Sequence, residues 1–276
     1  MTTQISLANT IAFPSHKGGV GKTTTVMYLA KAFAEPRSVT KKGLRVLAID
    51  MDAQANLSKL MGVVVEDHMH IGSALGGAVA PTITLAQILR PVGQNIQLAP
   101  SRIDLANVEV GLQQAAFNPT FGFGRALTAL RRAIDPIRSD FDVILIDCPP
   151  AAGILTVNAM LASGQLVLPS LPEETSIDGL KTILQVLKQM QDDLKYSPQI
   201  LGTVATMVQQ KTVSHQQGLA KLATLTADGQ TTDNGKANGE SLEMLGEIYF
   251  RKGKDAETRI YEYYQKLAEK IWKRMQ

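Results

Sequence analysis

The chain contains almost no cysteine, no long apolar run and no large excess of either charge. Cys148 is the only cysteine among 276 residues, which excludes an internal disulfide framework and favours a reducing compartment. One thiolate also cannot hold an iron–sulfur cluster, which needs several. No apolar stretch approaches the roughly 20 residues of a membrane-spanning helix, and the first residues lack the pattern of a signal peptide. We therefore expect a cytoplasmic protein without stable membrane insertion.

The remaining composition is that of a globular protein with a full-sized core. Hydrophobic residues make up 45% of the chain and charged residues 19%, so a large core can be buried. The net charge of +3 is only mildly basic and has a consequence only where the positive residues cluster.

Apolar runs with the length of strands alternate with segments of helical periodicity. The strand-like runs lie at residues 5–13, 44–49, 96–99, 143–146, 166–168, 200–205 and 247–250. Helical segments include residues 24–34, 124–134, 177–190 and 256–275. This alternation predicts an α/β fold with a doubly wound, mostly parallel twisted sheet flanked by helices. Because no boundary interrupts the pattern, we expect a single domain over residues 1–276.

A glycine-rich loop follows the first expected strand and reads F-P-S-H-K-G-G-V-G-K-T-T-T from residue 13. The ordinary phosphate-binding loop, G-x-x-x-x-G-K-[ST], would have glycine in place of His16. The second half of that motif is intact: the glycines leave backbone N–H groups open to phosphate, Lys22 supplies charge and the Thr23 hydroxyl can bind Mg²⁺. The predicted nucleotide-binding residues are Lys17, Gly18, Gly19, Val20, Gly21, Lys22, Thr23 and Thr24.

Carboxylates follow two of the expected strands, at the sheet edge where open α/β sheets bind ligands. Asp50 and Asp52 end one apolar run, and period-two alternation predicts that both point to one side while Met51 points to the other. Asp147 ends the run at residues 143–146, where its carboxylate could hold Mg²⁺ through water.

These motifs resemble those of the ParA/MinD family of deviant Walker ATPases, and most of all the standalone ParA-type partition ATPases. K-G-G-V-G-K-T-T is similar to the family's loop with its extra first lysine, and D-M-D-A-Q-A-N from residue 50 to the family's D-x-D-P-Q-G-N. Here Ala53 and Ala55 replace the family's proline and glycine. F-D-V-I-L-I-D-C-P-P from residue 141 is similar to its Walker B element. The resemblance implies a P-loop NTPase fold and covers roughly residues 9–60 and 140–185.

The resemblance also implies roles for these residues, with ATP and Mg²⁺ as cofactors. Lys17 would reach across a dimer interface to the partner's nucleotide, so the implied catalytic residues are Lys17, Lys22 and Asp52, the last orienting the attacking water. Asp50 would support the magnesium shell together with Thr23 and Asp147. The strand around residues 201–208 is similar to the one that touches adenine in the family, which makes Met207 a candidate base contact.

Basic residues outnumber acidic ones from residue 251 onward, and such a cluster can bind DNA phosphates without reading sequence. Arg251, Lys252 and Lys254 are the candidate DNA-binding residues. The resemblance implies an ATPase that forms an ATP-dependent homodimer, binds DNA nonspecifically in the nucleoid and positions a plasmid, chromosome locus or protein cargo. A ParB-like or other adaptor protein would stimulate hydrolysis.

Two other functions stay open from the sequence. Residues 256–275 carry an apolar stripe beside basic residues and a tryptophan, which would suit a MinD-like ATPase that cycles on and off a membrane. The same spacing also describes a helix packed on its own core. A phosphotransferase acting on a small molecule could use the same scaffold, although the sequence shows no dedicated substrate residues.

Overall fold

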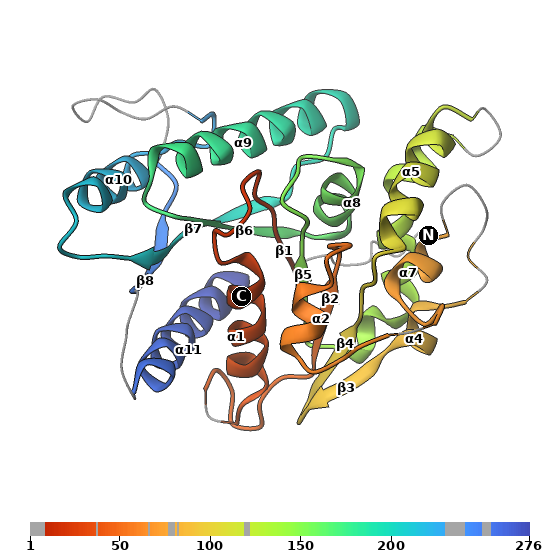
Figure 1. Ribbon diagram of the computed structural model, residues 1–276, viewed down its shortest axis with the longest axis horizontal. Coiled ribbons are helices and arrows are strands. Elements are labelled where there is room, and N and C mark those ends of the chain that lie inside the picture. The colour runs from red at the N-terminus through yellow and green to blue at the C-terminus, as the bar shows by residue number, and fades with distance from the viewer. Residues whose placement is uncertain are drawn as a thin grey trace.

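The centre of the fold is one eight-stranded sheet with the strand order β3-β4-β2-β5-β1-β6-β7-β8 (Figure 1). The computed structural model describes residues 9–36, 38–65, 67–76, 81, 83–118, 122–229, 241–249 and 255–276. The strands are β1 Thr10–Phe13, β2 Val46–Asp50, β3 Arg90–Gly93, β4 Ile96–Ala99, β5 Val143–Asp147, β6 Gln165–Ser170, β7 Gln199–Val208 and β8 Met244–Tyr249. Neighbouring strands are parallel except for β3 and β4, which are antiparallel. The predicted α/β fold with a mostly parallel sheet is confirmed.

Helices connect the strands and cover both faces of the sheet. They are α1 Lys22–Ala34, α2 Asn56–Leu60, α3 Ile71–Leu75, α4 Leu85–Ile88, α5 Leu105–Ala116, α6 Phe123–Leu127, α7 Ala129–Ile134, the 3₁₀ turn η1 Asp135–Asp140, α8 Ile154–Ala162, α9 Glu174–Leu194, α10 Val213–Ala223 and α11 Ala256–Met275. Figure 1 shows α9 and α10 on one side of the sheet and α1 and α11 on the other.

Two buried clusters correspond to these two faces. Leu47 and Ile49 of β2 belong to the cluster that also holds residues of α3, α4, α5, α8 and α9. Val46 and Ala48 of the same strand belong to the cluster with α1, α2 and α11. Because side chains alternate along a strand, a central strand that is covered on both faces reads as a continuous apolar run.

The terminal helix α11 packs on α1. The rings of Tyr28 and Tyr264 are stacked with centroids 5.0 Å apart, and the hydroxyls of Thr25 and Tyr264 lie 3.1 Å apart. Leu267 and Ile271 from the same stripe are also buried. The apolar stripe predicted for this segment therefore contacts the chain's own core. Among the described residues, no helix combines the length and the apolar character needed to cross a membrane.

Two segments differ from the sequence-based expectation. Residues 124–134 form two short helices, since the backbone leaves the helical region at Thr128 (φ −108°, ψ 15°), whose hydroxyl donates to the Gly124 carbonyl over 2.7 Å. Residues 90–93 form an antiparallel edge strand that the apolar pattern did not predict, because Pro91 and Gly93 interrupt it. Neither difference touches the sheet edge where the candidate site lies.

Candidate functional site

The glycine-rich loop lies between the end of β1 and the start of α1. Gly19 and Gly21 have φ values of 75° and 77°, a left-handed conformation that side-chain-bearing residues rarely adopt. The hydroxyl of Thr206 at the end of β7 lies 2.8 Å from the carbonyl oxygen of Val20 and 3.2 Å from that of Ser170 at the end of β6. Thr206 thus connects the loop to β7 and to the end of β6, in addition to β1, which precedes the loop.

The start of α1 faces this loop without a competing anion. No side chain caps its first turn, and that turn contains no acidic residue. Lys22 is buried, while Thr23 and Thr24 are half-buried. A helix N-terminus with free N–H groups and a buried lysine favours a bound anion.

Two buried carboxylates lie side by side at the carboxyl ends of β2 and β5. The strand register pairs Asp50 with Asp147, and pairs Asp147 with Phe13, the last residue before the loop. Asp50 accepts hydrogen bonds from the backbone N–H of Ser58 over 2.9 Å and from its hydroxyl over 2.8 Å. The side chain of Thr23 hydrogen-bonds to the carboxylate of Asp147, but the buried Oδ1 of Asp147 accepts no hydrogen bond from the described residues.

The electrostatics of this pair indicate a shortage of positive charge. Burial, followed by the negative charge of Asp50, raises the pKa of Asp147 to about 8, although Thr23 and Lys22 act in the opposite direction. Burial also raises the pKa of Asp50 to about 6 against the hydrogen bonds from Ser58. Two carboxylates that repel each other in a buried position, one with an unsatisfied oxygen, are the donor set that suits a hard divalent cation.

Asp52 lies outside the strand, because β2 ends at Asp50. Its N–H donates to Asp50 Oδ1 over 3.2 Å, and its Oδ1 accepts the N–H of Gln54 over 3.0 Å. Met51 packs into the cluster on the opposite face, as the alternation predicted. The carboxylate is half-buried and can therefore meet a water molecule that Asp50 and Asp147 could not.

Lys17 is held by the segment that follows β6. Its Nζ donates to Glu173 Oε2 over 3.2 Å and to the Thr175 hydroxyl over 2.7 Å. The side chains of Lys17 and Glu173 are 34% and 44% exposed, so the pair can open at little cost. Sequence reasoning missed both partners, together with Thr206 and Ser58. For Glu173 and Thr175 the available signal was their place just after a parallel strand, at the ligand-binding edge.

Of the remaining predicted residues, the structure describes Met207 but not the three candidate DNA-binding residues. Met207 lies next to Thr206 at the carboxyl end of β7, with φ 52° and 41% of its surface exposed, so it lies at the predicted edge with its side chain accessible. Arg251, Lys252 and Lys254 lie outside the described residues.

The chain is similar in sequence to a known family model and to several bacterial partitioning proteins. Residues 8–200 match the family model described as an AAA domain. The chain is 31% identical to the sporulation initiation inhibitor protein Soj of Bacillus subtilis over 73% of this chain and 74% of Soj. It is 32% identical to the chromosome partitioning protein ParA of Caulobacter vibrioides over 75% of this chain and 72% of that protein. A match to an uncharacterized Mycobacterium tuberculosis protein, at 32% identity over 78% of this chain, spans 63% of that longer protein.

Solved structures share the fold over nearly the whole chain. McdA from Cyanothece superposes with a TM-score of 0.74 at 20% identity, covering 96% of this chain and 98% of McdA. Cobyrinic acid a,c-diamide synthase from Mycobacterium smegmatis, solved with an ATP analogue and magnesium, gives a TM-score of 0.73 at 25% identity, covering 95% and 93% of the two chains.

Proposed function

The chain belongs to the ParA/MinD family of P-loop ATPases, and on that basis we propose that it hydrolyses ATP as a nucleotide-dependent homodimer. The ATP-bound dimer would bind DNA nonspecifically, associate with the nucleoid and position a cargo. An adaptor protein would stimulate hydrolysis and so release the dimer from DNA. The observation that carries the catalytic part is the meeting of one buried lysine and two buried, mutually repelling carboxylates beside an uncapped helix.

The residues fit ATP and Mg²⁺. The backbone of residues 18–24 would hold the phosphates, with Lys22 as the counter-charge. Thr23, Asp50 and Asp147 would hold Mg²⁺, and the unsatisfied, buried Oδ1 of Asp147 supports this assignment. A bound magnesium ion neutralises charge on the outer phosphates during phosphoryl transfer.

Asp52 is the residue that we assign to the attacking water. Its backbone N–H and the N–H of Gln54 fix the turn through hydrogen bonds to Asp50 and Asp52 itself, so its carboxylate is held near the magnesium ligands. A carboxylate in this position orients a water molecule and accepts its proton. Glu109 of α5 lies near this carboxylate. Burial and, second, the charge of Asp52 raise the pKa of Glu109.

Lys17 would act in the partner subunit. In the single chain its ammonium group is bound by Glu173 and Thr175, so dimerisation would replace these contacts with the partner's phosphates. A positive charge that arrives only with the second subunit makes hydrolysis depend on dimerisation, as an arginine finger does.

Mixing two inactive variants tests this arrangement. Lys17→Gln should lower ATP turnover about 100-fold, since one transition-state donor is worth roughly 3 kcal/mol, while Asp52→Ala should keep ATP binding and lose turnover. A heterodimer of the two has one site with its own Asp52 and the partner's Lys17. An equal random mixture should therefore recover about a quarter of the parent activity. Turnover is measured without any small-molecule acceptor, which a phosphotransferase would require.

The matched control is Lys181→Gln, which removes a lysine of α9 that is half-buried like Lys17 and pairs with Asp178 over 3.0 Å. It should leave turnover unchanged. If verified heterodimers of Lys17→Gln and Asp52→Ala give only the sum of the two variants' activities, Lys17 does not act across the interface.

We assign DNA binding to Arg251, Lys252 and Lys254. Farther along, Lys270 and Arg274 of α11 both pair with Glu243, at 2.9 and 2.7 Å, which makes them less available to phosphate. Replacing the three candidate residues with alanine should weaken ATP-dependent DNA binding and reduce its logarithmic salt slope by about 0.9 per lost phosphate contact. Unchanged affinity and slope would contradict this assignment.

Flotation with anionic liposomes and ATP distinguishes DNA binding from a membrane-cycling function. Because the apolar stripe of α11 is buried, we expect the protein not to float with the liposomes.

A further inference from the structure

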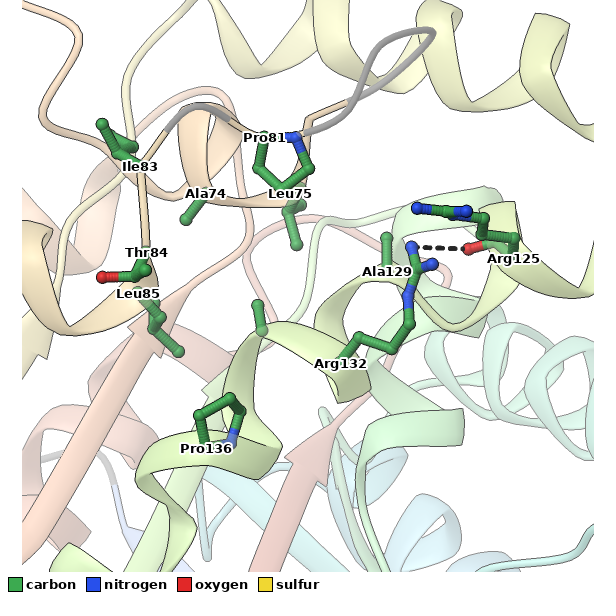
Figure 2. Close-up of a pocket in the computed structure, with 11 residues that line it drawn as sticks. Ala74, Leu75, Pro81, Ile83, Thr84, Leu85, Arg125, Ala129, Arg132 and Pro136 are labelled. Atoms are coloured by element: carbon green, nitrogen blue, oxygen red, sulfur yellow. Dashed lines mark hydrogen bonds between the residues drawn. The ribbon is translucent and has the colours of Figure 1, made fainter. Parts of the chain in front are cut away.

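A second pocket lies between α3, α4, α6 and α7, and its lining includes none of the residues of the phosphate loop or the strand-end carboxylates. Its volume is about 320 Å³. Figure 2 shows Leu75 and Pro81 on one side of it, Thr84 and Leu85 on another, and Ala129 and Pro136 facing them. The pocket falls at the small end of the size range of about 300–1,000 Å³ that is usual for small-molecule sites.

The walls of this pocket are mostly apolar. Leu75 and Leu85 belong to the buried core cluster. Ala129 and Ala133 of α7 present small side chains on the facing wall. This cavity therefore favours an apolar body, because burying it removes apolar surface from water on both sides.

One end of the pocket is positively charged. Arg125 and Arg132 both line it, and Figure 2 shows the two side chains as neighbours. The Nη2 of Arg132 donates to the carbonyl oxygen of Arg125 over 3.1 Å. Burial and, second, the charge of Arg125 lower the pKa of Arg132.

Two neighbouring arginines, Arg131 and Arg138, have an acidic partner in Asp135. Asp135 pairs with Arg138 over 3.1 Å and contacts Arg131 at 4.0 Å. In the part of the chain that the structure describes, no carboxylate lies within ion-pair distance of Arg132. Its remaining N–H donors are arranged as a planar fork, which matches the two oxygens of a carboxylate.

We propose that this pocket binds a small amphiphilic organic acid, whose carboxylate pairs with Arg132 and whose apolar body lies against Leu75, Leu85 and α7. The charge of Arg132 and the apolar walls select together for this chemistry: a bare anion would leave the walls in contact with water, and an uncharged apolar molecule would leave Arg132 without a counter-charge. The site is independent of the nucleotide site and of the proposed ATPase function.

Direct binding to the full chain tests this proposal. Octanoate and 4-phenylbutyrate are titrated by calorimetry to distinguish an alkyl from an aryl body, with 1-octanol and acetate as probes of each half alone. We expect saturable binding of at least one of the two acids below 1 mM, at least about tenfold tighter than 1-octanol or acetate, in keeping with a charge-assisted hydrogen bond. Arg132→Gln should weaken that binding about tenfold.

Two further variants make the test specific. Ala133→Phe fills the pocket and should abolish binding. Arg131→Gln removes the neighbouring arginine of α7, which contacts Asp135 and does not line the pocket, and should leave acid binding unchanged. Circular dichroism melts establish that each variant is folded, and ATP affinity should stay within about twofold of the parent.

Several results would overturn the proposal. One is the absence of saturable binding of either acid up to 10 mM. Another is equal binding of octanoate and 1-octanol together with no effect of Arg132→Gln, which would indicate a nonspecific apolar surface. Binding of an acidic, apolar peptide at this site where both small acids fail would replace it with a protein-docking surface.

Discussion

The two ends of strand β5 carry aspartates in opposite situations. At its amino end, Asp142 pairs with Arg45: the guanidinium Nη2 lies 2.8 Å from Oδ1, and the backbone N–H of Arg45 donates to Oδ2 over 2.8 Å. Hydrogen bonding by Arg45 lowers the pKa of Asp142. At the carboxyl end, Asp147 is buried beside Asp50 and its pKa is raised.

This difference distinguishes the edge of the sheet where exposed charges are paired from the edge where we propose the nucleotide site. At the amino edge Asp142 pairs with Arg45 and Asp135 pairs with Arg138, although the Nε of Arg138 is buried and donates to no partner among the described residues. The carboxyl edge leaves a buried carboxylate oxygen and an uncapped helix start unsatisfied. A buried carboxylate oxygen without a partner beside a helix start without a cap is costly, and a bound cation and a bound anion would offset that cost.

The largest expected effect follows from removing charge at each edge in turn. Lys22→Ala should weaken ATP binding by more than about 100-fold, because a buried counter-charge to the outer phosphates is lost. Arg45→Ala, at the opposite edge, should leave ATP affinity within about threefold. Titration with a fluorescent ATP analogue measures both. Equal affinities in the two variants would refute the assignment of the phosphate loop.

A smaller effect is expected when each aspartate is neutralised in nucleotide-free protein containing a chelator. Asp147→Asn should raise the free energy of unfolding near pH 7 by about 1 kcal/mol, because it removes, at constant size, a carboxyl whose ionisation is opposed by burial and, second, by the charge of Asp50. Asp142→Asn should lower it by up to about 1 kcal/mol through loss of an exposed ion pair. Urea denaturation measures both changes.

Addition of ATP and Mg²⁺ should make the parent more stable than Asp147→Asn, the reverse of the order expected without nucleotide. The parent should gain about 2.7 kcal/mol at a hundredfold excess over the dissociation constant, and Asp147→Asn should gain less. If Asp147→Asn destabilises the nucleotide-free protein as Asp142→Asn does, the buried carboxyl group of Asp147 does not reduce the stability of the protein.

The smallest effect concerns the turn after β2. Ala55 has φ 52°, a conformation that costs an alanine about 1 kcal/mol and glycine almost nothing. Ala55→Gly should therefore stabilise the protein by about 0.5 kcal/mol after the entropy that glycine adds to the unfolded chain. Ala53→Gly, two residues earlier, should destabilise it by a similar amount. A melting-temperature difference of the opposite sign would show that the turn is not strained at Ala55.

Sequence alone was enough to predict the α/β class, the mostly parallel sheet and most of its strands. The reason is physical: strands covered on both faces must be apolar along their whole length, and residues 96–99 and 143–146 were delimited to within one residue. The edge strand β3 and the break at Thr128 escaped prediction, because both depend on local backbone geometry rather than on apolar periodicity.

For the candidate site, the order of residues along the chain predicted which side chains carry charge at the carboxyl edge of the sheet, since each follows a parallel strand directly. The tertiary structure alone decided how those charges meet. Strand order sets Asp50 beside Asp147, although 97 positions separate them, and burial then turns two ordinary carboxylates into a mutually repelling pair. In the same way, only folding brings Lys17 to Glu173 and Arg132 to its apolar pocket, because no local pattern encodes contacts between segments so far apart.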